Sequence, residues 1–84
     1  MPNYRIELEE EGVDEVETIR KAVVDTDAAI RYASGCIRHR HYYVSRLQGW
    51  TRVSCGGEGD AVATVQGTMN GGGYVAAHIF EDGN

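Results

Sequence analysis

The sequence is short of the features that mark membrane, secreted and redox proteins. Its 84 residues contain no run of about 18 apolar residues, which excludes a membrane-spanning helix. The first residues show no basic region followed by an apolar stretch, so we expect no secretory signal and a cytoplasmic protein. The two cysteines, Cys36 and Cys55, form no CxxC motif. We expect two free, partly buried thiols, with a disulfide inside the chain or between two copies as the alternative.

Motifs for catalysis and metal binding are also missing. Cys36, His39, His41 and Cys55 are of the types that ligate zinc, but their spacing matches no common zinc framework and arginines lie between them. A thiolate–imidazole pair of Cys55 with His78 or His41 lacks any local signature of a nucleophile. We therefore expect no metal site and no covalent catalysis.

Two glycine-rich segments, 56–60 and 71–73, precede predicted strands, whereas phosphate-binding loops lead into a helix. They are expected to be hairpin connections, and no cofactor is expected. A chain this short forms one domain, residues 1–84, and buries only roughly 60–65% of its unfolded surface. Because such a core leaves little room for a deep, dry cavity, the sequence favours a binding protein over an enzyme.

What the sequence does have is a sharp sorting of charge. Residues 28–57 carry five arginines and two histidines without an acid, and residues 58–84 carry four acids without Lys or Arg. Residues 7–17 have no base and seven carboxylates: Glu7, Glu9, Glu10, Glu11, Asp14, Glu15 and Glu17. The net charge of −5 weakens nonspecific nucleic-acid binding, while the local fields of both signs act on charged partners.

Local patterns predict two strands followed by a helix. Residues 4–9 alternate apolar and polar, which is typical of a half-buried strand. Residues 10–15 predict a loop or hairpin turn, and the β-branched segment 16–24 predicts a second strand, with a helical first half as the alternative. Asp25-Thr26-Asp27 predicts a helix N-terminus, and the cations at 38–40 suit a helix C-terminus. Gly35 is expected to weaken the last turn of this helix.

From residue 42 onward the pattern is strand after strand. Segments 42–47 and 50–55 flank Gln48-Gly49, a predicted tight turn, and 61–68 and 74–80 follow. The order β-β-α-β-β-β-β predicts an α+β fold in which a single helix packs on a mostly antiparallel sheet of five to six strands. The predicted core places helix residues Ile30, Ala33 and Ile37 against sheet residues such as Ile6, Leu8, Val65 and Ile79.

The acidic segment 7–17 is the preferred partner-binding site. Along a strand it would present carboxylates at intervals of roughly 6–7 Å, near the phosphate spacing of nucleic acids, and could occupy a basic groove on another protein. A solvated strand face and loop is the structural alternative. No direct contact with nucleic acid or membrane is favoured for this mode of binding.

An alternative binding site lies in the basic and aromatic segment 38–52. Cations interleaved with aromatics can follow phosphates and stack on bases. On a strand, Arg38, Arg40 and Tyr42 would share a face, as would Arg46, Trp50 and Arg52 if the hairpin register allowed. A helix-end cap followed by an amphipathic hairpin accounts for the same residues, so both interpretations remain open.

In size and layout the whole chain resembles small phage or mobile-element proteins, in particular anti-CRISPR proteins. The shared features are a short acidic chain, one helix against an antiparallel sheet, no catalytic motif and polarised charge. The resemblance involves no shared motif and assigns no functional residue. It implies an inhibitor that binds a bacterial CRISPR effector, such as a type I complex, in the host cytoplasm and blocks DNA access or nuclease recruitment.

Self-association is also expected. A thin core and several apolar strands leave an open sheet edge and an incompletely covered sheet face. Large side chains that could remain outside the cover of the helix are Tyr42, Tyr43, Trp50 and Phe80. The sequence therefore predicts a homodimer, with Cys36 or Cys55 close to the twofold axis.

Overall fold

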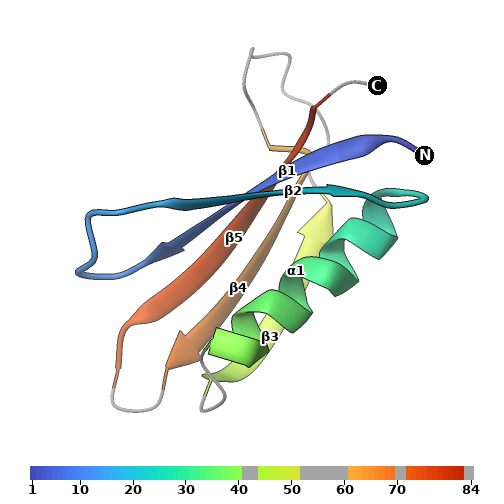
Figure 1. Cartoon of the computed structure of the whole chain (residues 1–84). Helices are drawn as coiled ribbons and strands as arrows, with labels where there is room; N and C mark the ends of the chain where they lie inside the picture. The colour runs from blue at the N-terminus through green and yellow to red at the C-terminus, as the bar shows by residue number, and fades with distance from the viewer. Residues whose placement is uncertain (41–43, 52–60, 70–71, 83–84) are drawn as a thin grey trace.

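The computed structural model describes residues 1–40, 44–51, 61–69 and 72–82. These residues form one helix and five strands, arranged as a sheet with the helix on one face (Figure 1). Among the described residues, no helical segment combines the length and the apolar composition that spanning a bilayer requires. The elements, in chain order, are β1 (Asn3–Glu10), β2 (Glu17–Ala22), α1 (Thr26–Arg40), β3 (Val44–Thr51), β4 (Ala63–Met69) and β5 (Tyr74–Glu81).

The sheet has the strand order β2-β1-β5-β4-β3, and every neighbouring pair is antiparallel. The chain begins at one side of the sheet, crosses over through α1 to the far edge, and returns strand by strand to β1. The α+β class, with one helix and an antiparallel sheet, is thus confirmed. The termini of β1 and β5 meet, since the backbone N–H of Asp82 donates to the carbonyl of Asn3 at 2.9 Å.

The predicted turn at Gln48-Gly49 is wrong. Both residues lie inside β3, where Gln48 pairs with Gln66 and Gly49 with Val65. The irregularity comes earlier, as a shift of register between Ser45 and Gln48. A bulge lets one strand bend without reversing, and β3 then continues in regular register through Gly49. Residues 44–51 thus form one strand where the sequence predicted parts of two, and residues 42–43 and 52–55 lie outside the described residues.

The core follows the predicted alternation of β1. Tyr4, Ile6 and Leu8 are buried on the face covered by α1, and register places Ile6 beside Ile79 and Leu8 beside Ala77. The helix contributes Ala29, Ala33 and Ile37, all fully buried. Ile30 was also predicted to face the sheet, but it is only partly buried, at the margin of this cluster.

The helix begins where the Asp-Thr-Asp segment predicts. Asp25 is the N-cap residue: its Oδ1 accepts a hydrogen bond from the backbone N–H of Ala28 at 2.8 Å, and its carbonyl accepts one from the N–H of Ala29 at 3.1 Å. The helix passes through exposed Gly35 and ends at Arg40. Gly35 was expected to weaken the last turn, but the helix continues through it without a break.

Replacing the N-cap is expected to destabilise the fold measurably. Asp25→Ala removes the acceptor for the Ala28 N–H and should lower the free energy of unfolding by about 1 kcal/mol. Asp27→Ala, in the first turn, removes only a favourable charge and should cost a few tenths of a kcal/mol. Urea denaturation of both variants measures the difference, and equal losses would contradict the cap assignment.

Two exposed glycines should respond to alanine with opposite signs. Gly12 has φ of +84°, which L-residues rarely adopt, so Gly12→Ala should cost roughly 1–2 kcal/mol. Gly35 is helical and has open space around an added Cβ, so Gly35→Ala should stabilise by about 1 kcal/mol. Thermal or urea unfolding measures both changes; the same sign for the two would be inconsistent with these backbone conformations.

The sheet face opposite α1 carries cross-strand ion pairs near β2. Arg5 lies between three groups: its Nε is 3.1 Å from Glu7, its Nη1 is 3.6 Å from Asp82, and its guanidinium stands 4.5 Å from the centre of the Phe80 ring. Arg20 on β2 donates to the same Asp82 at 3.1 Å. These contacts tie β2, β1 and the end of β5 together on the outer face, at modest energy because they are partly exposed.

Candidate functional site: an acid-rimmed pocket at the hairpin of β1 and β2

The hairpin that joins β1 and β2 extends beyond the end of α1 (Figure 1). Its turn is closed by a hydrogen bond from the N–H of Val13 to the carbonyl of Glu10, at 3.1 Å. A second bond, from the N–H of Glu11 to the carbonyl of Tyr74 at 2.9 Å, fastens the turn to the start of β5. The positive φ of Gly12 reverses the chain. The acidic segment is therefore held as a defined structure on the sheet.

A pocket of about 410 Å³ lies where this hairpin meets the last turns of α1. Its apolar lining comes from three distant parts of the chain: Leu8 on β1, Ile37 on α1 and Val75 on β5. Val13 and Val16, which are 48% and 53% exposed, complete the apolar surface from the hairpin itself. Val13 and Val16 are thus accessible apolar side chains beside a cluster of carboxylates, above the buried Leu8, Ile37 and Val75.

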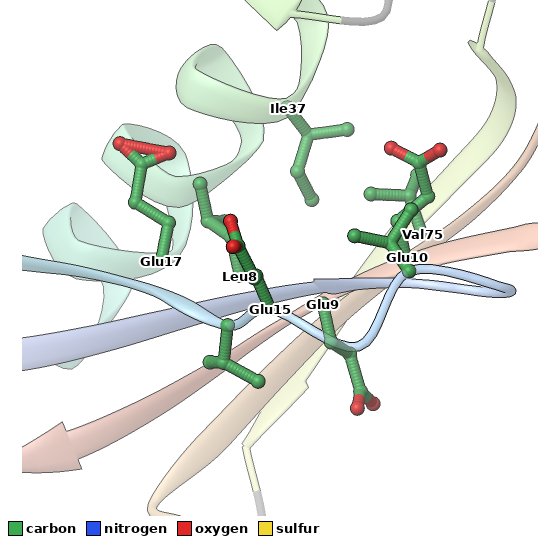
Figure 2. Close-up of a pocket in the computed structure, with 9 residues that line it drawn as sticks. Leu8, Glu9, Glu10, Glu15, Glu17, Ile37 and Val75 are labelled. Carbon is green, nitrogen blue, oxygen red and sulfur yellow. The ribbon is translucent and has the colours of Figure 1, made fainter.

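Four glutamates line the same pocket, but they do not point the same way. In Figure 2 the carboxylates of Glu10, Glu15 and Glu17 lie on the side of the hairpin that faces Ile37. Glu9 points in the opposite direction, toward the outer face, where its Oε1 is 2.7 Å from Nε2 of His78. The pocket rim therefore carries three acids over an apolar floor.

The seven predicted binding acids are split by the fold. Glu7 and Glu9 lie on the outer face and pair with Arg5 and His78. Glu10, Glu15 and Glu17 surround the pocket on the helix side. Glu11 and Asp14 are exposed in the turn region. The predicted interval of every second residue along a strand applies to Glu7 and Glu9 on the outer face of β1, whereas the other five acids lie on the opposite face, in the turn or near β2.

The alternative basic site is only partly described. Arg38 is exposed in the last turn of α1, and Arg40 ends the same helix. Both residues lie in a helix and not in a strand, so the strand face predicted to carry them is wrong. Tyr42 and Arg52 lie outside the described residues. Arg46 falls within the register shift of β3, and Trp50 pairs by register with Thr64.

A second cavity, of about 470 Å³, lies between α1 and β2. Its lining is mixed: Ile19, Arg31, Tyr32, Gly35, Cys36 and His39. The ammonium of Lys21 stands 5.3 Å from the centre of the Tyr32 ring, and the nearby thiol of Cys36, followed by desolvation, raises the pKa of Tyr32 above its usual value.

The remaining sequence candidates do not gather into a reactive group within the described part of the chain. Cys36 and His39 line the second cavity together, but His41 and Cys55 lie outside the described residues. The described ranges contain no cluster of three His, Cys, Asp or Glu residues placed to hold a metal ion. His78 is paired with Glu9 on the outer face.

Of the two predicted glycine-rich loops, residues 56–60 and Gly71 lie outside the described residues. Gly72 and Gly73 form a turn between β4 and β5, in which the N–H of Met69 donates to the carbonyl of Gly73 at 3.1 Å. That turn joins two strands, as expected from the sequence.

No protein family, curated protein or solved structure matches this chain. What the chain does must therefore be inferred from its own pocket. Sequence reasoning found the acids of that pocket but missed its apolar half. Val13 and Val16, interspersed among the acids, were the available signal; Ile37 and Val75 could not be assigned to the same site, because only the tertiary fold brings them there.

Proposed function

We propose that this chain is a binding protein whose pocket at the β1–β2 hairpin receives a basic, partly apolar segment of another protein. The observation that carries the proposal is the combination in one pocket of an apolar floor with the carboxylates of Glu10, Glu15 and Glu17. An arginine or lysine side chain matches this combination, since its methylene stem packs on apolar surface and its charged end reaches carboxylates.

The proposed partner is a nucleic-acid-handling protein complex in the bacterial cytoplasm, such as a CRISPR effector, which this small protein would inhibit. Proteins that hold nucleic acid carry grooves rich in Lys and Arg. An acidic chain with a net charge of −5 is electrostatically complementary to such a groove and would compete there with the nucleic acid. Binding, with no chemical step, is sufficient for this activity.

A synthetic peptide that alternates arginine and leucine tests the pocket directly. The intact protein should bind this peptide, measured by fluorescence anisotropy, more tightly than it binds a lysine–glycine peptide of equal charge, because only the first uses the apolar floor. Glu10→Gln/Glu15→Gln should weaken binding of the arginine–leucine peptide by about tenfold and reduce its salt dependence. Glu17 is left unchanged because it also lies on the edge strand β2.

Asp27→Asn/Glu81→Gln is the matched control. It makes the same change in net charge at two exposed positions outside the pocket, so it should leave affinity nearly unchanged. Equal losses in the two double variants would show that only overall charge attracts the peptide, and would contradict a role for the pocket. Circular dichroism before and after each substitution confirms that the fold is intact.

A further inference from the structure

Strand β2 forms one edge of the sheet, and the structure shows which of its backbone groups face outward. Val23 donates its N–H to the carbonyl of Pro2, one step beyond the pair Asn3–Ala22. Hydrogen-bonded pairs alternate along an antiparallel ladder, so Ile19 and Lys21 also direct their N–H and C=O groups toward β1. Thr18 and Arg20 therefore direct their backbone N–H and C=O groups away from the sheet, at the open edge.

The side chains of β2 alternate in a self-complementary order. Glu17, Ile19 and Lys21 are opposite the inward-facing Leu8, Ile6 and Tyr4 in the register with β1. Lys21 reaches the Tyr32 ring of α1, and Figure 2 shows Glu17 on the helix side. On this face Glu17 thus lies two residues before Ile19, and Lys21 lies two residues after it.

We propose that this edge binds a second copy of the chain, with the two β2 strands antiparallel and Ile19 on the twofold axis. In that register Thr18 and Arg20 of one copy exchange backbone hydrogen bonds with Arg20 and Thr18 of the other, because both positions have outward-facing groups. Ile19 packs against Ile19 in a close, non-hydrogen-bonded pair. Glu17 stands opposite Lys21 of the second copy, twice by symmetry.

Charge selects this register over its neighbours. The hydrogen-bonding pattern permits only shifts that keep outward-facing residues opposite one another, which moves the axis from Ile19 to Thr18 or to Arg20. An axis at Arg20 sets two arginines side by side, which is unfavourable. An axis at Thr18 puts Glu17 opposite Ile19. With the axis at Ile19, both Glu17 and Lys21 meet an opposite charge.

The apolar surface around β2 also fits a second copy. Val16 and Val24, which flank the strand, are 53% and 65% exposed. Helix α1 packs mainly across β3, β4 and β5, so the helix-side face of β2 is left beside the cavity that contains Ile19, Tyr32 and Cys36. Pairing two β2 strands sets these half-covered surfaces next to each other and removes the exposed edge, which is a liability in a free sheet.

This inference shares Glu17 with the proposed function. Glu10 and Glu15, which the peptide experiment substitutes, take no part in the strand pairing, so the two proposals can fail separately. Sedimentation velocity over a wide range of protein concentration should show a mass that rises from 9.2 kDa toward twice that value. Thr18→Pro should keep the protein monomeric: it removes an outward-facing N–H from an edge strand, where proline is tolerated, and leaves the pairing with β1 in place.

Charge exchange gives a second, independent test. Lys21→Glu and Glu17→Lys each turn two attractive cross-strand pairs into repulsive ones. The dimer dissociation constant of each variant alone should therefore rise by about tenfold or more. A mixture of the two variants restores opposite charges at both pairs and should dimerise more strongly than either alone. Arg38→Glu, an equal charge change on an exposed position of α1, should behave as the unmodified protein.

Two results would overturn the proposal. One is a mass of 9.2 kDa for the unmodified protein at every concentration. The other is a mixture of the two charge variants that associates no better than its components. If Thr18→Pro fails to fold, as judged by circular dichroism, the mixing experiment alone decides.

Discussion

The Ile37→Ala variant is expected to lose about 2–5 kcal/mol of unfolding free energy, the largest stability change proposed for this chain. Ile37 is fully buried and belongs to the cluster that joins α1 to β1 and β5. A domain of this length is typically stable by only about 4–12 kcal/mol, so the substitution should bring it close to unfolding. Ile37 also lines the acid-rimmed pocket, so its removal would deepen the pocket floor.

Ile30→Ala is the matched control, because it deletes the same atoms from a less buried position two turns earlier in α1. Ile30 is only partly buried, at the edge of the cluster. The Ile30→Ala variant should therefore lose less than about 1.5 kcal/mol of unfolding free energy. The measurement is urea denaturation followed by circular dichroism. A larger loss for Ile30 than for Ile37 would contradict the difference in burial between these two positions.

The Glu10→Lys/Glu15→Lys variant is expected to show the largest change in partner binding. Reversing two rim charges replaces two attractions for a basic peptide with two repulsions, in a site where an apolar floor excludes part of the water. Affinity for the arginine–leucine peptide should fall by roughly a hundredfold at low salt, and an acidic peptide of the same leucine content should begin to bind. Fluorescence anisotropy with both peptides measures the exchange.

Asp27→Lys/Glu81→Lys provides the comparison for this reversal. The same change in net charge, placed at exposed positions away from the pocket, should alter binding only through long-range attraction and should lose its effect at physiological salt. If it weakens peptide binding at physiological salt as much as Glu10→Lys/Glu15→Lys does, the acids of the hairpin do not form a local site. Because the exchanged residues are not in the core, all these variants should unfold near the original midpoint.

The sequence predicted those parts of the fold that depend on local pattern. Period-two alternation identified β1 and its buried residues Tyr4, Ile6 and Leu8, and the Asp-Thr-Asp segment located the start of α1. The error at Gln48-Gly49 has the same origin. A glycine between two β-rich segments predicts a turn when only neighbours are considered, whereas pairing with β4 carries β3 straight through this position.

The candidate site was determined in part by the sequence and in part by the tertiary structure. Residues 7–17 set the acidity of the hairpin by themselves, since no base lies among them. Only the fold decided which acids act together: strand alternation sends Glu7 and Glu9 to the outer face, and chain reversal brings Glu15 and Glu17 back beside Glu10. The apolar floor required Ile37 and Val75, which are far apart in the chain. Charge is a property of composition, but a pocket is a property of long-range packing, and that packing depends on contacts that no local pattern specifies.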